Sequence, residues 1–166
     1  MYLIARKKAH FEAISAGIQP EGRDNPFGFR ADRLCQILVT PTPRITDPNG
    51  TILSVYKLES DLRQAMTIRN ALIFHDDKQV VMLVSASTTA ALERNLDILS
   101  KTAPAMSISV GASEIYQGGR LHSHSRGLAS QAAEALLRRN RAGLLRYQEM
   151  GLELLLKRQA RQDVRV

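Results

Sequence analysis

A short polar turn between two apolar runs holds the residues of this sequence whose types could do chemistry. The turn contains His75, Asp76, Asp77, Lys78 and Gln79, and it lies between ALIF and VVMLVSA. Carboxylates at the tip of a hairpin can hold a divalent metal, but Asp is also favoured in turns because it tolerates their geometry. Lys78 partly neutralises the acidic pair, and neighbouring residues of a strand point to opposite faces. We therefore expect a solvated turn that lacks the second half of a metal site.

Two further segments carry residue types that can bind ligands. In HSHS, His122 and His124 lie two residues apart, and on an extended strand they would share one face and could begin a zinc site. No Cys or acidic pair lies nearby in the sequence, so we expect a polar loop before a helix. The glycines of QGGR (117–120) could cradle a phosphate, but the Lys-Ser/Thr ending of a P-loop is missing. The sequence predicts no catalytic residue, no metal and no cofactor.

The composition indicates a soluble, cytoplasmic chain with an aliphatic core. Hydrophobic residues make up 44% of the 166 residues, and aromatic residues only 5%. Cys35 is the single cysteine, so an intrachain disulfide is excluded, and its apolar surroundings favour a small buried strand residue. No apolar run approaches the ~20 residues of a membrane helix, and the N-terminus is not typical of a signal peptide. We expect no membrane partner.

The sequence has an excess of basic residues, which could form either a nucleic-acid-binding segment or a solvated helix face. The net charge is +7, and nine basic residues stand against four acidic ones from Arg126 onward. Such a segment could bind nucleic acid directly, with an affinity that falls steeply as salt rises. Neither a helix-turn-helix nor interleaved aromatic residues accompany it, so a solvated helix face is the expected structure.

Hydrophobic periodicity and turn residues predict the order of helices and strands. A leading helix and a Gly/Pro-rich linker should occupy residues 1–30, and the main domain residues 31–166. Helices are expected at 3–18, 52–70, 87–103, 126–143 and 149–162, and strands at 33–41, 106–113 and 144–148, with a β-hairpin at 71–85.

The first six elements of the main domain follow the order βαββαβ. This order closes into a ferredoxin-like antiparallel sheet with the spatial order 4-1-3-2, and the helices are expected to cover one face of it. A helix, a short strand and a terminal helix should follow. The predicted fold class is therefore α+β.

Three stretches in this order resemble the nucleotide-cyclase-like GGDEF domains. They are LIFHDDKQVVMLVS at the signature hairpin, SISVGAS before the last long helix, and ASQAAEALLRRNRAGLLRY across that helix and the short strand. The continuation LLRYQEMGLELLL is similar to the degenerate GGDEF-like domain of bacterial regulators of the CdaR/PucR type. In this continuation, Tyr147, Glu149 and Gly151 precede leucines at 152 and 154–156. The whole resemblance covers roughly residues 33–157.

The resemblance implies a domain without cyclase chemistry. Active members of the superfamily need acids at the end of the first strand and on the hairpin turn to hold metal and nucleotide. Here the strand is CQILVTPTPR, with no acid, and the turn HDDKQ has no glycine. We expect a non-catalytic regulatory or dimerisation domain of a transcription regulator. DNA would be bound by a helix-turn-helix outside this chain, and a small-molecule effector is unidentified. The alternative is a divergent nucleotide-binding or cyclase-like enzyme domain.

A leucine cluster near the C-terminus suggests a surface for a second subunit. Leu152, Leu155 and Leu156 lie with Leu154 within five residues, and one helix face cannot bury all of them against one domain. We expect a homodimer, formed through this helix or through the leading helix. The alternative is that the terminal helix is sandwiched within its own domain.

Overall fold

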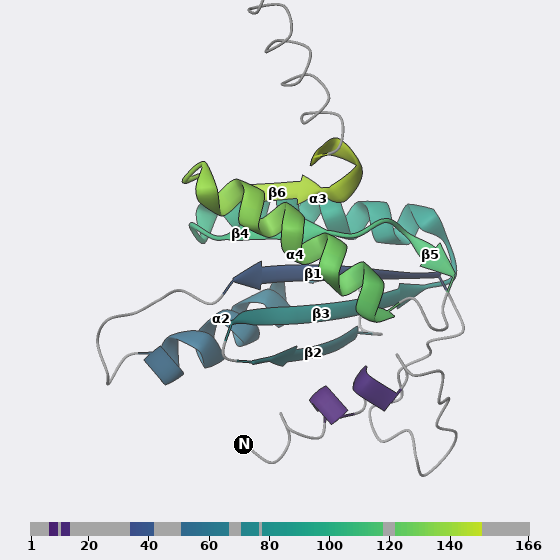
Figure 1. Cartoon of the computed structure of the whole chain (residues 1–166), viewed down its shortest axis with the longest axis horizontal. Helices are drawn as coiled ribbons and strands as arrows, with labels where there is room; N and C mark the ends of the chain where they lie inside the picture. Colours follow the sequence, from purple (N-terminus) through teal and green to yellow (C-terminus); the bar gives the residue numbers. More distant parts are fainter. Residues whose placement is uncertain are drawn as a thin grey trace, which may run out of the picture.

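The computed structural model describes residues 7–9, 11–13, 34–41, 51–66, 71–76, 78–117 and 122–150 (Figure 1). The main elements follow the order that the sequence predicts. They are β1 (Leu34–Pro41), α2 (Thr51–Ala65), β2 (Ala71–His75), β3 (Gln79–Ala86), α3 (Thr89–Ala105), β4 (Ser109–Ala112), β5 (Tyr116–Gln117), α4 (His122–Arg138) and β6 (Gly143–Arg146).

The strands form one six-stranded, mostly antiparallel sheet in the order β2-β3-β1-β4-β6, with β5 paired to β1. The order of the first four strands is the predicted 4-1-3-2. The expected hairpin is confirmed, because β2 and β3 pair antiparallel from Ala71↔Val84 to His75↔Val80. β6 adds to the edge of β4 in parallel, so the sheet is mixed at that edge. The predicted α+β fold is confirmed.

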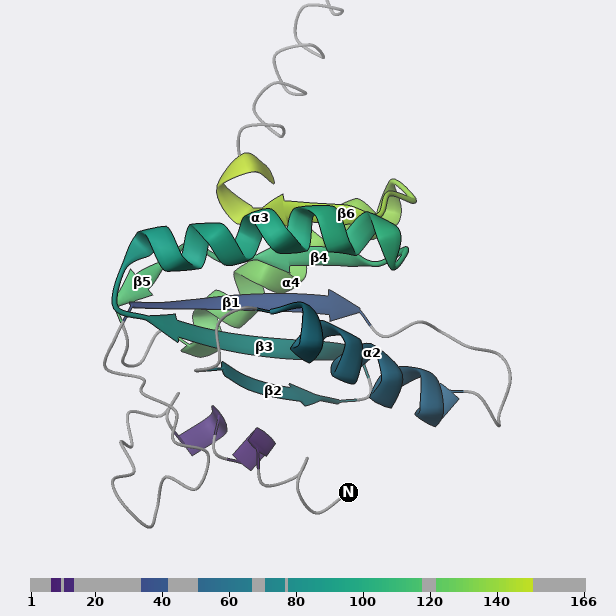
Figure 2. The ribbon, with the colours of Figure 1, turned by 180° about the vertical axis from the view of Figure 1, so that it is seen from behind.

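The helices cover both faces of the sheet. The two helices of the βαββαβ unit lie on one face, as expected, whereas the following helix covers the other face, which was not predicted. α2 and α3 lie on one face and α4 crosses the other, as the two opposite views show (Figures 1 and 2). The physical reason lies in β1 and β3, whose side chains are buried on both faces. Leu38 packs with α2 and α3, whereas Ile37 and Val39 belong to the cluster that includes Ala129 of α4.

Close packing of α4 on the sheet depends on small residues. A Cβ built on Gly111 of β4 would lie 1.9 Å from the carbonyl oxygen of Ala129 and 2.4 Å from the nitrogen of Ala133. The buried face of α4 is correspondingly rich in alanine, including Ala132. The helix backbone therefore rests directly on the strand.

The ends of α4 differ from the predicted ends. The helix begins at His122, four residues before the predicted start, because His122, Ser125 and Ala129 form one buried face at helical spacing. It ends at Arg138 rather than Gly143. Asn140 adopts a positive φ of 53°, and Gly143, with φ +139°, begins β6. β5 also occupies part of the segment where only a loop was expected.

Residues 7–9 and 11–13 are helical and are called here the leading segment. Phe11 is 2% exposed and belongs to the core cluster of the strand face that α4 covers. At the other end, residues 147–150 are helical, and Leu152, Leu155 and Leu156 lie outside the described residues. The dimer surface proposed on those leucines therefore stays a prediction. None of the described helices is long and apolar enough to cross a membrane.

Candidate functional site at the signature hairpin

The turn between β2 and β3 is closed by a backbone hydrogen bond. The N–H of Asp76 donates to the carbonyl oxygen of Gln79 at 3.0 Å. The register also places the end of β1 beside this turn, because Pro41 pairs with Gln79 and Thr40 with Val80. Asp77 lies outside the described residues. The turn and the end of β1 thus meet where an active superfamily member would need its acids.

The carboxylate of Asp76 is fully engaged by its own protein. Oδ1 accepts hydrogen bonds from the N–H groups of Lys78 and Gln79, at 2.9 and 3.0 Å. Oδ2 accepts from Nη2 of Arg126 at 2.6 Å. Burial raises the pKa of Asp76, but the hydrogen bonds from Lys78, Arg126 and Gln79 outweigh it and hold the pKa below its usual value. Asp76 is an ionised turn residue whose oxygens already have donors.

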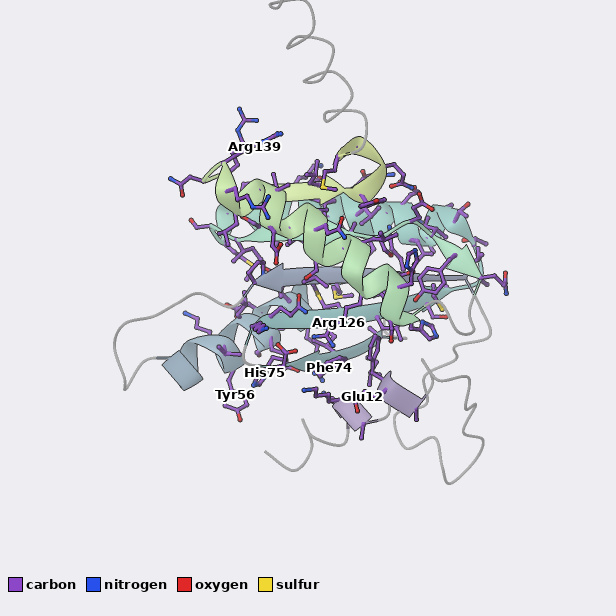
Figure 3. All side chains as sticks on the ribbon, in the orientation of Figure 1. Glu12, Tyr56, Phe74, His75, Arg126 and Arg139 are labelled. Carbon is purple, nitrogen blue, oxygen red and sulfur yellow. The ribbon has the colours of Figure 1, made fainter. Side chains whose placement is uncertain are left out.

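Arg126 of α4 is fixed by three kinds of contact. Its Cζ lies 5.9 Å from the ring centre of Phe11 and 5.7 Å from that of Phe74, within the range of cation–π attraction. With the amide oxygen of Gln79 facing Arg126, that oxygen accepts from Nη2 at 2.9 Å and from Nε at 3.1 Å. The same amide then donates to Oγ of Ser130 at 2.8 Å. Figure 3 shows Arg126 between α4 and the hairpin that carries Phe74.

The other side of the turn rests on α2. Nδ1 of His75 lies 3.2 Å from Oε2 of Glu59, and the ring of Tyr56 meets the His75 ring edge-on at 5.1 Å. Arg63, one helical turn after Glu59, lies 3.5 Å from its Oε1. Lys78 is exposed. His75 and Asp76 therefore point to different partners and do not share a ligand site.

Metal ligands do not converge on the described part of this hairpin. Strand β1 contains no carboxylate, and Oγ1 of Thr40 donates to the carbonyl oxygen of Ser109 at 2.9 Å. Across the described ranges, no group of three His, Cys, Asp or Glu side chains could hold a metal ion. The carboxylate that the sequence singles out is instead neutralised by an arginine.

The two histidines of HSHS both belong to α4 but lie in different surroundings. His122 is fully buried, and its Nδ1 lies 2.5 Å from the hydroxyl of Tyr116, whereas His124 is exposed. Burial lowers the pKa of His122 to about 4. Burial, followed by the charge of Cys35, raises the pKa of Tyr116. This pair is a buried neutral contact, and the expected loop geometry is wrong because α4 begins earlier.

Two residues that define the site, Arg126 and Glu59, were not found from the sequence. Arg126 lies 50 residues from Asp76 along the chain, and Glu59 lies 16 residues from His75. Each lies on a helix, and no local sequence pattern distinguishes it from the other polar residues of that helix. The only available signal was the predicted topology, which places α2 and α4 near the hairpin without specifying a side chain.

Comparison with known families assigns the domain to a family. A family model described as the GGDEF-like domain matches residues 21–135, and no curated protein matches the chain. The match includes the first four strands, the signature hairpin and most of α4. Because it spans more than half of the 166 residues, the chain belongs to the GGDEF-like domain family.

Proposed function

We propose that this GGDEF-like domain is a non-catalytic regulatory and dimerisation domain of a bacterial transcription regulator of the CdaR/PucR type. The main support for the non-catalytic part of this proposal is that the Asp76 carboxylate already accepts hydrogen bonds from its own protein. Both of its oxygens accept hydrogen bonds from within the chain, and one of the donors is the Arg126 guanidinium. A metal would have to displace a positive charge at 2.6 Å from the one described carboxylate of the turn.

The end of β1 supports the same conclusion. Metal-assisted phosphoryl transfer needs carboxylates that hold the ion against the triphosphate. Thr40 and Pro41 stand beside the turn, and the Thr40 hydroxyl already donates to the backbone of β4. Neither side chain can supply the charge that a magnesium–nucleotide complex requires.

The regulatory part of the proposal rests on resemblance in the C-terminal motifs. Tyr147, Glu149 and Gly151, followed by leucines, continue from β6 as in the CdaR/PucR regulators. In such a regulator, DNA would be bound by a helix-turn-helix outside the residues of this chain, and the domain would act as a homodimer. A twofold dimer suits regulators that bind palindromic sites.

The test measures both catalysis and self-association on the same purified protein. Purified protein with GTP and Mg²⁺ should form no cyclic dinucleotide, and sedimentation at micromolar concentration should show a dimer. Asp76→Asn is the matched variant, because it removes the charge of the carboxylate and keeps its size. A cyclic dinucleotide product that disappears in Asp76→Asn would establish the alternative, a divergent cyclase-like enzyme. A clean monomer would remove dimerisation from the proposed role.

A further inference from the structure

The leading segment contacts the groups that hold the signature hairpin. Its two helical turns lie beside β2 in both views (Figures 1 and 2). Phe11 packs against Phe74 with tilted rings whose centres lie 5.2 Å apart, and its ring centre lies 6.3 Å from that of His122. Since Phe11 is almost completely buried, the segment fills part of the core rather than resting on the surface.

The connection runs from Phe11 through Arg126 to the turn. Phe11 and Phe74 both lie within cation–π range of the Arg126 guanidinium, which holds Asp76 and Gln79. A ring on the guanidinium keeps water away, and an ion pair strengthens as water is excluded. Removing the ring would therefore weaken the contact between Arg126 and the turn.

Lys7 of the same segment adds a charge near Glu59, the carboxylate that contacts His75. Lys7 is 8% exposed and Glu59 is 7% exposed, so both charges are largely removed from water. Burial and the nearby Arg63 charge lower the pKa of Lys7, while Glu59 acts in the opposite direction. Glu59 also contacts His75 at 3.2 Å. A buried carboxylate needs compensating charge, and Lys7 supplies part of it.

We propose that the leading segment is a docked control element, and that its docking through Phe11 sets the order of the β2–β3 turn. Movement of the segment loosens the grip of Arg126 on Asp76. The hairpin is thus the place where a signal that displaces the segment is received. This coupling goes beyond the proposed role and would hold whether or not the domain belongs to a transcription regulator.

The test uses the full chain and amide hydrogen exchange measured by NMR. Phe11→Leu keeps an apolar side chain but removes the ring from Arg126, and Phe11→Ala removes most of the contact. The readout is the exchange rate of the Asp76 and Gln79 amides, divided by that of amides in the centre of β3 such as Leu83. We expect this ratio to rise about tenfold in Phe11→Ala and less in Phe11→Leu.

Leu99→Val is the matched control. Leu99 is fully buried on the opposite face, in the cluster that contains Leu38 and Leu96 rather than Phe11. Its replacement should raise the exchange of the turn and the strand centre together and leave the ratio unchanged. If Phe11→Ala fails to fold, Phe11→Leu decides alone. An unchanged ratio in the Phe11 variants, or an equal rise in Leu99→Val, would overturn the proposal.

Discussion

Gly111→Ala is expected to prevent α4 from packing on the sheet. The added methyl carbon would lie 1.9 Å from the carbonyl oxygen of Ala129, 2.4 Å from the nitrogen of Ala133 and 3.0 Å from the carbonyl carbon of Ala129. All three atoms are backbone, so no side-chain rotation can relieve the contact, and the helix must move away from β4. We expect the free energy of unfolding to fall by about 3 kcal/mol or more. Urea denaturation followed by circular dichroism measures this change.

Gly127 offers a control on the same helix. A Cβ at this position would meet no atom within 4 Å. Ala is favoured over Gly within a helix by about 0.5–1 kcal/mol, so Gly127→Ala should raise the free energy of unfolding slightly. A Gly111→Ala protein as stable as Gly127→Ala would show that α4 does not rest on β4 as described.

Acid should destabilise the domain through His122 before it protonates most carboxylates. Burial lowers the pKa of His122 from 6.5 in the unfolded chain to about 4 in the folded protein. The unfolded state therefore binds more protons between these values, and stability falls as the pH drops through this window. A difference of this size corresponds to at most about 3 kcal/mol. Asp76, whose folded pKa is lowered, adds a further loss only as the pH falls below its ordinary value of 3.8.

The surroundings of His122 explain why the imidazolium is disfavoured. Nδ1 meets the Tyr116 hydroxyl, and Nε2 has no hydrogen-bond partner among the described residues. Phe11, Cys35 and Ser125 are the other groups around this pair in the contacts described. Phe11 and Ser125 carry no charge, so neither of them compensates a proton on His122.

Denaturation at a series of pH values from 7 to 4 measures the effect. His122→Phe keeps an aromatic ring without a titrating group, and its stability should change less over this window than that of the wild type. His124→Gln is the control, because His124 is exposed. If His122→Phe retains the full pH dependence, another group accounts for it.

The order of the helices and strands could be predicted from the sequence better than the way in which they pack on one another. Alternation and apolar runs identified β1, the hairpin and α3, whose N-cap Thr88 accepts a hydrogen bond from the N–H of Ala91. The coverage of both faces was missed, although LCQILV is apolar on both sides of a strand. The predicted start of α4 was also late, because polar His122 and Ser125 conceal the buried face to which they belong.

The candidate site could be located from the sequence but not explained by it. The turn residues His75, Asp76 and Lys78 lie where the hairpin was predicted. The partner of Asp76 depends on how α4 crosses the sheet, and that crossing is set by the contact of Gly111 with Ala129 and Ala133. No local pattern encodes such a distance, so the contact between Arg126 and Asp76 could not be predicted from the sequence.

The central claim is that the described carboxylate of the signature turn is held by Arg126 and is unavailable to a metal. Paramagnetic Mn²⁺, added at equimolar concentration to ¹⁵N-labelled protein, tests it directly, because Mn²⁺ broadens the NMR signals of amides near its site. The exposed Asp97 on α3 serves as an internal reference for weak surface binding. We predict that the Lys78 and Gln79 amides broaden no more than those next to Asp97. Selective broadening at Lys78 and Gln79 that EDTA reverses would contradict the claim.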